Sequence, residues 1–267
     1  MWLGTNDLQI LLVEPSAMQA RVIEQALLRI GVGQVEVAAN GGEALMMMRD
    51  RAPSCVISAM YLPDMTGTDL VFAMREDAAL EWLPFILVSS ETRPQVLAPV
   101  RQSGACGILP KPFSDEQLRR AIAATLEVLQ EDESLSELGV EVERLKVLIV
   151  DDSKSSRGFI RRVLESVGVH DCFEAGNGVD GLAILQDQMV DLVITDYHMP
   201  QMDGRDFIEH VRHEGWQREV PILMVTSEAD QGRLAAVEQA GVSGIFDKPF
   251  DPASVKAMLA QIFSARS

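Results

Sequence analysis

The stretch Leu192-Val-Ile-Thr-Asp-Tyr-His-Met-Pro-Gln-Met-Asp-Gly204 decides the fold of the chain. Its apolar start, from Leu192 to Ile194, predicts a short strand that is buried on both faces of a sheet. The strand ends at Asp196, and the following Pro200 and Gly204 predict that the chain then turns. In open parallel α/β sheets, ligands bind at the carboxyl ends of strands, where this carboxylate would lie. A single aspartate in such a position more often caps a turn, so its role depends on the other strand ends.

Polar side chains follow three further strands that we expect in the same half of the chain. Residues 146–150 end in Asp151 and Asp152, residues 221–225 end in Thr226, and residues 244–247 end in Lys248. Parallel strands place their carboxyl ends on one edge of a sheet, so three carboxylates, a hydroxyl and an ammonium group converge. Clustered carboxylates repel one another by about 1–4 kcal/mol per pair and need a counter-ion. The set predicts a Mg²⁺ site at which a carboxylate carries a phosphoryl group.

The first half of the chain repeats this pattern at one constant offset, without a gap through the motif region. Gly31 matches Gly168, Pro63 matches Pro200, Gly67 matches Gly204, and Lys111-Pro-Phe113 matches Lys248-Pro-Phe250. Strands are expected at 10–13, 35–38, 55–58, 85–88 and 106–109, and helices at 16–29, 41–50, 67–77, 93–102 and 114–130. Two copies of a unit with five strands alternating with five helices predict two doubly wound domains with parallel sheets.

The expected domains are residues 1–130 and residues 146–267, joined by an acidic linker over residues 131–145. The linker has six acidic side chains and one basic side chain, and its apolar residues recur at helical spacing. It is therefore either an extension of the preceding helix or a solvated connection.

Composition limits the classes of function. The chain of 267 residues is 47% hydrophobic and has a net charge of −17, and neither domain is basic. An acidic chain argues against a direct nucleic-acid surface and favours divalent cations or basic partner proteins. The three cysteines, Cys55, Cys106 and Cys172, are widely spaced, which suggests reduced thiols. Since no signal peptide or membrane-spanning stretch is evident, we expect a cytoplasmic protein with no membrane contact.

The set Asp151-Asp152, Asp196, Thr226 and Lys248-Pro249 resembles the receiver domain of bacterial response regulators, above all the chemotaxis receivers. The resemblance covers residues 146–264, with five elements in the right order at the right strand ends. It implies that each (βα)5 domain is flavodoxin-like, with a five-stranded parallel sheet of order 2-1-3-4-5.

The same resemblance implies a role for each residue of the second copy. Asp196 would accept a phosphoryl group from a sensor histidine kinase or a phosphotransfer protein. Asp151, Asp152, Asp196 and the backbone carbonyl of His198 would hold Mg²⁺. Thr226 and Lys248 would bind the phosphoryl oxygens and signal to a distal face, and the Lys248–Pro249 peptide would be cis. Ile245 departs from the family pattern, which often has an aromatic residue three positions before the lysine.

The first copy lacks most of this chemistry. The counterparts of Asp151, Asp152, Asp196, Thr226 and Lys248 are Glu14, Pro15, Ala59, Ser89 and Lys111. Alanine cannot be phosphorylated and proline offers no metal ligand, so this copy resembles a pseudo-receiver. Lys111 is expected to pair with Glu14, and Pro99 to kink or shorten the fourth helix. A role in dimerisation or partner binding is the favoured interpretation, and a domain that only supports its neighbour is the alternative.

We therefore expect a response regulator that signals through a downstream protein effector, with a homodimer as one arrangement, and not an enzyme. Three alternatives stay open at this stage. The chain could be the N-terminal fragment of a longer regulator with a separate output domain. It could be an aspartyl-phosphate hydrolase, although His198 stands where such enzymes place a second aspartate. It could also be a constitutive scaffold in which phosphorylation is incidental.

Overall fold

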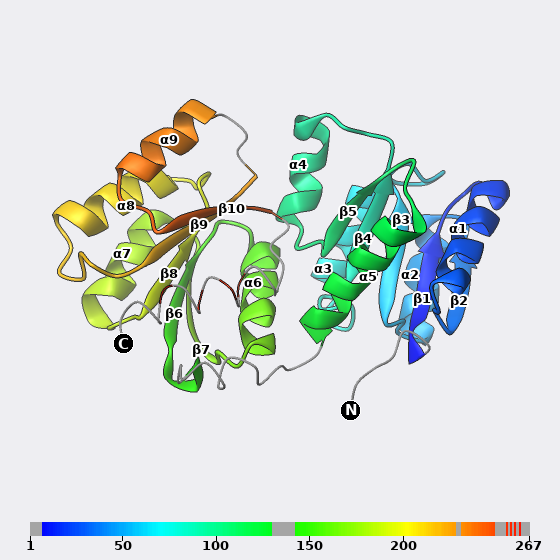
Figure 1. The fold of residues 1–267 in the computed structure, drawn as a ribbon, viewed down its shortest axis with the longest axis horizontal. Coiled ribbons are helices and arrows are strands. Elements are labelled where there is room, and N and C mark those ends of the chain that lie inside the picture. The colour runs from blue at the N-terminus through cyan, green and yellow to red at the C-terminus, as the bar shows by residue number, and fades with distance from the viewer. Residues whose placement is uncertain are drawn as a thin grey trace. The chain divides into compact units, whose positions relative to one another are not determined.

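The computed structural model describes residues 7–129, 142–227 and 231–248, together with residues 255, 257, 259 and 262. The chain divides into two compact units, Met1–Gln130 and Glu131–Ser267 (Figure 1). In the described part of the chain, no helix is both long enough and apolar enough to cross a membrane. All three cysteines are free, as their spacing predicted.

The first unit is a parallel five-stranded sheet with helices on both faces. Its strands are β1 (Gln9–Val13), β2 (Gln34–Ala38), β3 (Cys55–Ala59), β4 (Phe85–Ser89) and β5 (Gly107–Pro110). Its helices are α1 (Ala17–Arg29), α2 (Gly41–Asp50), α3 (Gly67–Glu76), α4 (Pro94–Gln102) and α5 (Asp115–Leu129). The strand order is β2-β1-β3-β4-β5, as predicted.

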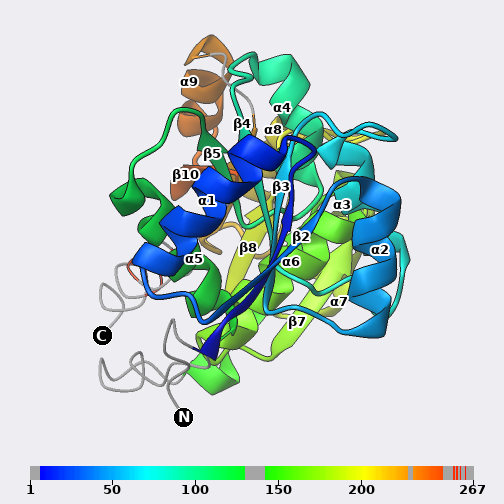
Figure 2. The same ribbon diagram turned by 90° about the vertical axis from the view of Figure 1, so that its right-hand side faces the viewer.

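Alternation along the strands divides the core of this unit into two layers. Ile10 and Leu12 of β1 pack with apolar side chains of α1 and α5, whereas Leu11 and Val13 pack with those of α2, α3 and α4. Successive strand residues point to opposite faces, so an uninterrupted apolar run fills both layers. Figure 2 shows α1 and α5 on one side of the sheet and α2 and α3 on the other.

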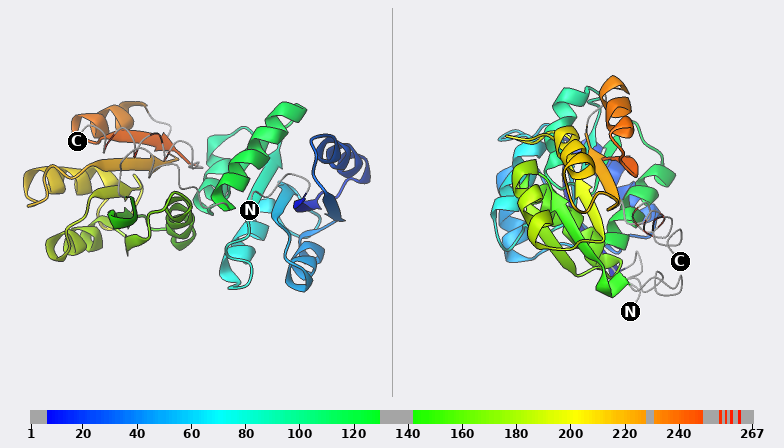
Figure 3. Two further views of the ribbon diagram at one scale, coloured as in Figure 1. Left: turned by 60° about the horizontal axis from the view of Figure 1, so that its bottom comes forward. Right: turned by 90° about the vertical axis from the view of Figure 1, so that its left-hand side faces the viewer.

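The second unit has the same architecture. Its strands are β6 (Lys146–Val150), β7 (Asp171–Ala175), β8 (Leu192–Thr195), β9 (Ile222–Thr226) and β10 (Gly244–Asp247), in the order β10-β9-β8-β6-β7. Its helices are α6 (Lys154–Ser166), α7 (Gly178–Asp187), α8 (Gly204–His213) and α9 (Gln231–Gln239), preceded by the 3-10 turn η3 (Val142–Arg144). Figure 3 shows helices on both sides of each sheet. Of the expected fifth helix, residues 255, 257, 259 and 262 are described, and they are helical.

The two units agree residue by residue in the placement of their elements. Each strand of the second unit begins at the same offset from its counterpart, from Gln9 and Lys146 for the first pair to Gly107 and Gly244 for the last. Capping side chains recur at this offset, because Ser16 and Ser153 both cap the first helix of their unit. A side-chain oxygen at this position satisfies an otherwise unpaired backbone N–H. The prediction of two flavodoxin-like doubly wound domains is confirmed.

The predictions on the linker and on Pro99 have different outcomes. Residues 130–141, most of the expected linker at 131–145, lie outside the described residues, so a helical linker stays a prediction. Pro99 lies inside α4, which continues to Gln102. The proline therefore does not end this helix, and a kink stays a prediction.

Candidate functional site

The carboxyl ends of β6 and β8 bring three carboxylates together in the second unit. Asp151 follows β6 and Asp196 follows β8, and both are buried, with 1% and 2% of their surfaces exposed. Asp152 is exposed beside them. One ligand oxygen from each residue lies within 4.8 Å of the other two. This spacing allows a single cation to contact all three residues, and hard oxygen ligands suit Mg²⁺.

Lys248 links two of these acids from the end of β10. Its Nζ lies 2.5 Å from Asp151 Oδ2 and 3.2 Å from Asp196 Oδ2, and only 4% of the lysine surface is exposed. The lysine backbone N–H donates to the carbonyl of Thr226, which ends β9 and is fully buried. The structure therefore places the predicted hydroxyl and ammonium groups at the same sheet edge as the acids. Pro249 lies outside the described residues, so a cis Lys248–Pro249 peptide stays a prediction, whereas the equivalent Lys111–Pro112 peptide is cis.

Burial and charge act against each other in this cluster. Burial raises the pKa of Asp196; Lys248 opposes this effect, the charge of Asp151 adds to it, and the net shift is upward. Burial alone would lower the pKa of Lys248, but the charges of Asp151 and Asp196 outweigh it and hold that pKa above its usual value. Two buried acids with one ammonium partner leave the cluster short of positive charge. A divalent cation would supply it.

One oxygen of Asp196 is left for a ligand. Its Oδ1 accepts a hydrogen bond of 2.7 Å from the backbone N–H of Tyr197. Its Oδ2 is buried and accepts no hydrogen bond from the described residues, although the charge of Lys248 lies 3.2 Å away. A buried carboxylate oxygen with one shared cationic partner is incompletely compensated for the loss of water. The residues therefore fit both a cation and a phosphoryl group at this oxygen.

Asp151 is held by partners that sequence reasoning missed. Its Oδ1 accepts from the backbone N–H of Ser153 at 2.8 Å, and its Oδ2 accepts from Ser156 Oγ at 2.6 Å. Arg157 Nη1 donates to the Asp151 carbonyl at 2.6 Å. Their position along the chain could have indicated these contacts, because Ser153, Ser156 and Arg157 lie in the loop and the first turn of the helix that directly follows Asp151.

The loop after Asp196 places the remaining predicted residues. His198 lies two residues beyond Asp196 with an exposed side chain, its ring 4.8 Å from that of Tyr197 in an edge-on arrangement. The role of its carbonyl as a metal ligand stays a prediction. A Cβ atom on Gly204 would collide with the carbonyl oxygen of Asp196. Glycine at this position thus lets the first turn of α8 approach the end of β8 closely.

The first unit forms a different set of contacts at the same place. Lys111 Nζ lies 2.9 Å from Glu14 Oε2 and 2.6 Å from Gln19 Oε1, which confirms the predicted pairing of Lys111 with Glu14. The backbone N–H of Ser16 also donates to the Glu14 carboxylate. Ala59 ends β3 where Asp196 follows β8, and Ser89 ends β4 as a buried hydroxyl. Lys111 is thus paired within the unit. The end of β3 carries the methyl group of Ala59 where the second unit has the carboxylate of Asp196.

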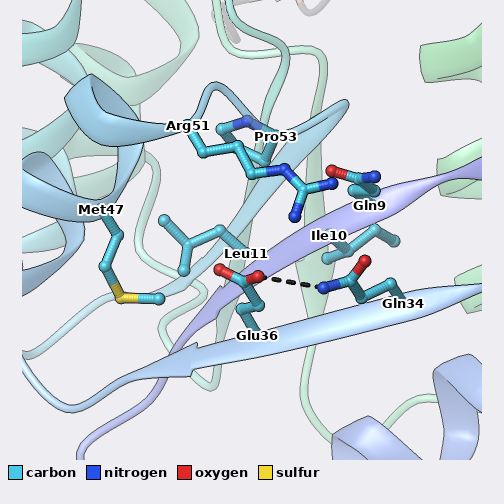
Figure 4. Close-up of a pocket in the computed structure, with 8 residues that line it drawn as sticks. All are labelled: Gln9, Ile10, Leu11, Gln34, Glu36, Met47, Arg51 and Pro53. Atoms are coloured by element: carbon cyan, nitrogen blue, oxygen red, sulfur yellow. Dashed lines mark hydrogen bonds between the residues drawn. The ribbon is translucent and has the colours of Figure 1, made fainter.

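A surface hollow in the first unit lies at the opposite edge of its sheet (Figure 4). It is lined by residues that begin β1 and β2, including Gln9 and Gln34, and by Pro53 shortly before β3. Gln34 donates to Glu36, two residues further along β2, at 3.0 Å. Because these are the amino ends of the strands, the hollow is separate from the edge that carries Lys111.

Comparison with known families gives two matches in this chain. The sequence pattern described as the response regulator receiver domain matches residues 10–123 and residues 147–260. The chain belongs to the response regulator receiver family. Each match corresponds to one of the two sheets, so the protein is a two-component response regulator with tandem receiver domains. The family implies interaction with histidine kinases or phosphotransfer proteins.

Curated relatives of these receivers include single-domain chemotaxis proteins. Chemotaxis protein CheY-3 of Vibrio cholerae is 36% identical over 119 residues, which cover 45% of this chain and 92% of the relative. Chemotaxis protein CheY of Pseudomonas aeruginosa is also 36% identical over 119 residues, covering 45% and 96%. A solved structure described as a putative two-component system response regulator/GGDEF domain protein aligns over 97% of this chain and 98% of its own. That alignment has 21% sequence identity and a TM-score of 0.43.

Proposed function

We propose that the second receiver accepts a phosphoryl group on Asp196 and that the first receiver does not. The observation that carries the proposal is the buried Oδ2 atom of Asp196, whose partner among the described residues is the Lys248 ammonium group, 3.2 Å away and shared with Asp151. Around it lie two further carboxylates and the ammonium group of Lys248. This combination suits a carboxylate nucleophile whose product carries additional negative charge.

The chemical step involves one bond formed and one bond broken. Asp196 Oδ2 attacks the phosphorus atom of a phosphohistidine on the donor protein and forms an acyl phosphate. The phosphorus–nitrogen bond breaks, and the donor histidine keeps the electron pair of that bond. Lys248 and the hydroxyl of Thr226 stabilise the oxygens of the transferred group. In this step Asp196 is a phosphoacceptor, and the chain does not turn over a separate substrate.

Asp151, Asp152 and Asp196 are proposed to hold Mg²⁺, with the carbonyl of His198 as a fourth protein ligand. The bound ion would supply positive charge to a cluster in which two buried carboxylates share one lysine. Asp196 Oδ2 supports this assignment, because it is buried and its charge is met only in part by Lys248, whose Nζ lies 3.2 Å away and 2.5 Å from Asp151 Oδ2.

Phosphorylation is proposed to alter contacts with a downstream protein through Thr226 and Lys248. The backbone bond between these residues joins the ends of β9 and β10, so movement at the phosphoryl group reaches both strands. Ile245 and Phe246 lie on β10 and are partly buried. A phosphoryl group adds up to about two negative charges, enough to bias a two-state element.

The first receiver is proposed to be a pseudo-receiver that contributes to dimerisation or binds a partner. Support comes from Ala59 at the end of β3 and from the paired state of Lys111. Since the core of this unit is complete and its strands keep the register of the second receiver, the fold is maintained without the acids.

Intact mass after incubation with a small phosphodonor and Mg²⁺ tests this function. Wild type should gain one phosphate, and Asp196→Ala should gain none. Ala59→Ser is the matched control, because it adds a hydroxyl at the equivalent position of the first receiver and should leave one phosphate on the chain. Phosphate on Asp196→Ala would contradict the proposal, and steady turnover of a phosphoester would favour a hydrolase.

A further inference from the structure

Ser156 contacts the acidic cluster from the first turn of α6. Its side chain is buried, with 3% of the residue exposed, and its Oγ donates to Asp151 Oδ2 at 2.6 Å. The same oxygen lies 2.5 Å from Lys248 Nζ. A hydroxyl buried this deeply needs an acceptor, and here the acceptor is a carboxylate of the acidic cluster.

The contacts of Asp151 leave little freedom for its carboxylate. A carboxylate offers about four lone-pair positions. The backbone N–H of Ser153 uses one on Oδ1, and Ser156 and Lys248 use two on Oδ2. About one position, on Oδ1, is left for a cation. Rotation of the carboxylate would break the bonds to Ser153 and Ser156 together, so these two donors fix its orientation.

In each receiver the side chain at this position contacts one member of the acid–lysine pair. Gln19 is the counterpart of Ser156 at the offset of the repeat, and its Oε1 accepts from Lys111 Nζ at 2.6 Å. In the second receiver the side chain donates to the acid, whereas in the first it accepts from the lysine. The polarity of the contact is therefore reversed in the unit that lacks the nucleophile.

We propose that Ser156 is a positioning residue for Mg²⁺, acting through Asp151. Its hydroxyl holds the Asp151 carboxylate so that Oδ1 is presented to the ion while Oδ2 stays engaged with Lys248. The identity of the ion rests on the proposed function. Hydrogen-bond partners of metal ligands orient those ligands, and their loss typically weakens metal binding by about 10- to 100-fold.

Calorimetric titration of the full chain with Mg²⁺ tests the role of Ser156. Ser156→Ala should weaken Mg²⁺ binding by about tenfold. Ser156→Thr keeps a hydroxyl and should stay within about twofold of wild type. Ser166→Ala is the control, because Ser166 is another buried serine of α6 whose Oγ donates to the Val163 carbonyl at 2.8 Å, away from the acids. It should leave Mg²⁺ affinity unchanged.

A paired substitution protects the test against loss of folding. Thr and Val at position 156 have nearly the same shape and differ in the hydroxyl, so a weaker affinity for Ser156→Val than for Ser156→Thr would support the inference. Equal Mg²⁺ affinity in folded wild type, Ser156→Ala and Ser156→Val would overturn it. Wild type that binds Mg²⁺ but takes no phosphate would reject the proposed function, while the affinities would still decide the role of Ser156.

Discussion

The two receivers carry the same sheet and the same serine cap on their first helix, but the charges at their strand ends are balanced differently. In the first receiver, Glu14 and Lys111 form one pair, and Gln19 satisfies the lysine further. In the second, Asp151 and Asp196 share Lys248, and Asp196 Oδ2 has no closer cation than the lysine nitrogen at 3.2 Å among the described residues. The first site pairs one acid with one lysine, whereas the second has two buried acids that share one lysine. The difference shows that the fold depends on its strands and caps and tolerates either arrangement.

Transfer of the acids should produce the largest effect. The triple variant Glu14→Asp, Pro15→Asp and Ala59→Asp gives the first receiver the acid set of the second, with Lys111 and Ser89 already present. Intact mass after phosphodonor treatment should rise from one phosphate to two. Ala59→Asp alone should stay at one, because Pro15 still withholds a metal ligand. A folded triple variant that stays at one phosphate would show that other residues separate the two sites.

Removal of each lysine should distinguish the two sites by stability. Lys248→Met leaves two buried carboxylates without their cation and should lower the free energy of unfolding by about 3 kcal/mol in EDTA. Lys111→Met should cost about 1–2 kcal/mol, because Lys111 is about a quarter exposed and the Glu14 carboxylate keeps the backbone donor of Ser16. Urea denaturation measures both losses. Saturating Mg²⁺ should reduce only the loss caused by Lys248→Met, and equal losses in EDTA would contradict the comparison.

Neutralisation of Asp196 should change stability in opposite directions with and without metal. Burial and the charge of Asp151 raise the pKa of Asp196, so its ionised form destabilises the metal-free fold at neutral pH. In EDTA, the free energy of unfolding of Asp196→Asn should therefore exceed that of wild type by about 1 kcal/mol. In excess Mg²⁺ the order should reverse, because wild type gains binding energy that the variant lacks. Thermal melts in both buffers check the sign. Ala59→Asn is the control, and its difference in stability from wild type should be the same in both buffers.

The smallest effect should come from a surface ion-pair cluster of the second receiver, in which Glu174 pairs with Arg157 and Arg161. Burial would raise the pKa of Glu174, but hydrogen bonds from Arg161 and Arg157 outweigh it and lower that pKa below its ordinary 4.5. The cluster therefore contributes its full stabilisation above pH 4.5, the ordinary pKa of a glutamate. It loses this contribution as the pH falls through the lowered pKa of Glu174. Glu174→Gln should cost about 1 kcal/mol or less at pH 7 and nothing in strong acid. Denaturation at several pH values measures the difference, and a pH-independent loss would point to packing instead.

The sequence predicted the fold well because its signals are local and doubled. Apolar runs such as Leu192 to Ile194 and caps such as Ser16 act over a few residues, and the constant offset of the repeat gave each element a second copy. The positions of the strand ends then predicted that Asp151, Asp196 and Lys248 lie on one edge of the sheet. Ser156 was not predicted as part of the site, because a serine in a first helical turn is ordinary in sequence. Its contact depends on side-chain direction and on which oxygen of Asp151 is already occupied.

The equal spacing of the elements has a consequence for inheritance of the gene. Because every described strand of one receiver begins at the same distance along the chain from its counterpart, an in-frame deletion between equivalent points always leaves one full set of five strands. A crossover before the codon of Glu14 would leave a chain that carries Asp151, Asp152 and Asp196, and one after the codon of Ala59 would leave Glu14, Pro15 and Ala59 in their place. Recombination within the gene can therefore convert the tandem into a single receiver of either kind without disturbing the reading frame or the sheet.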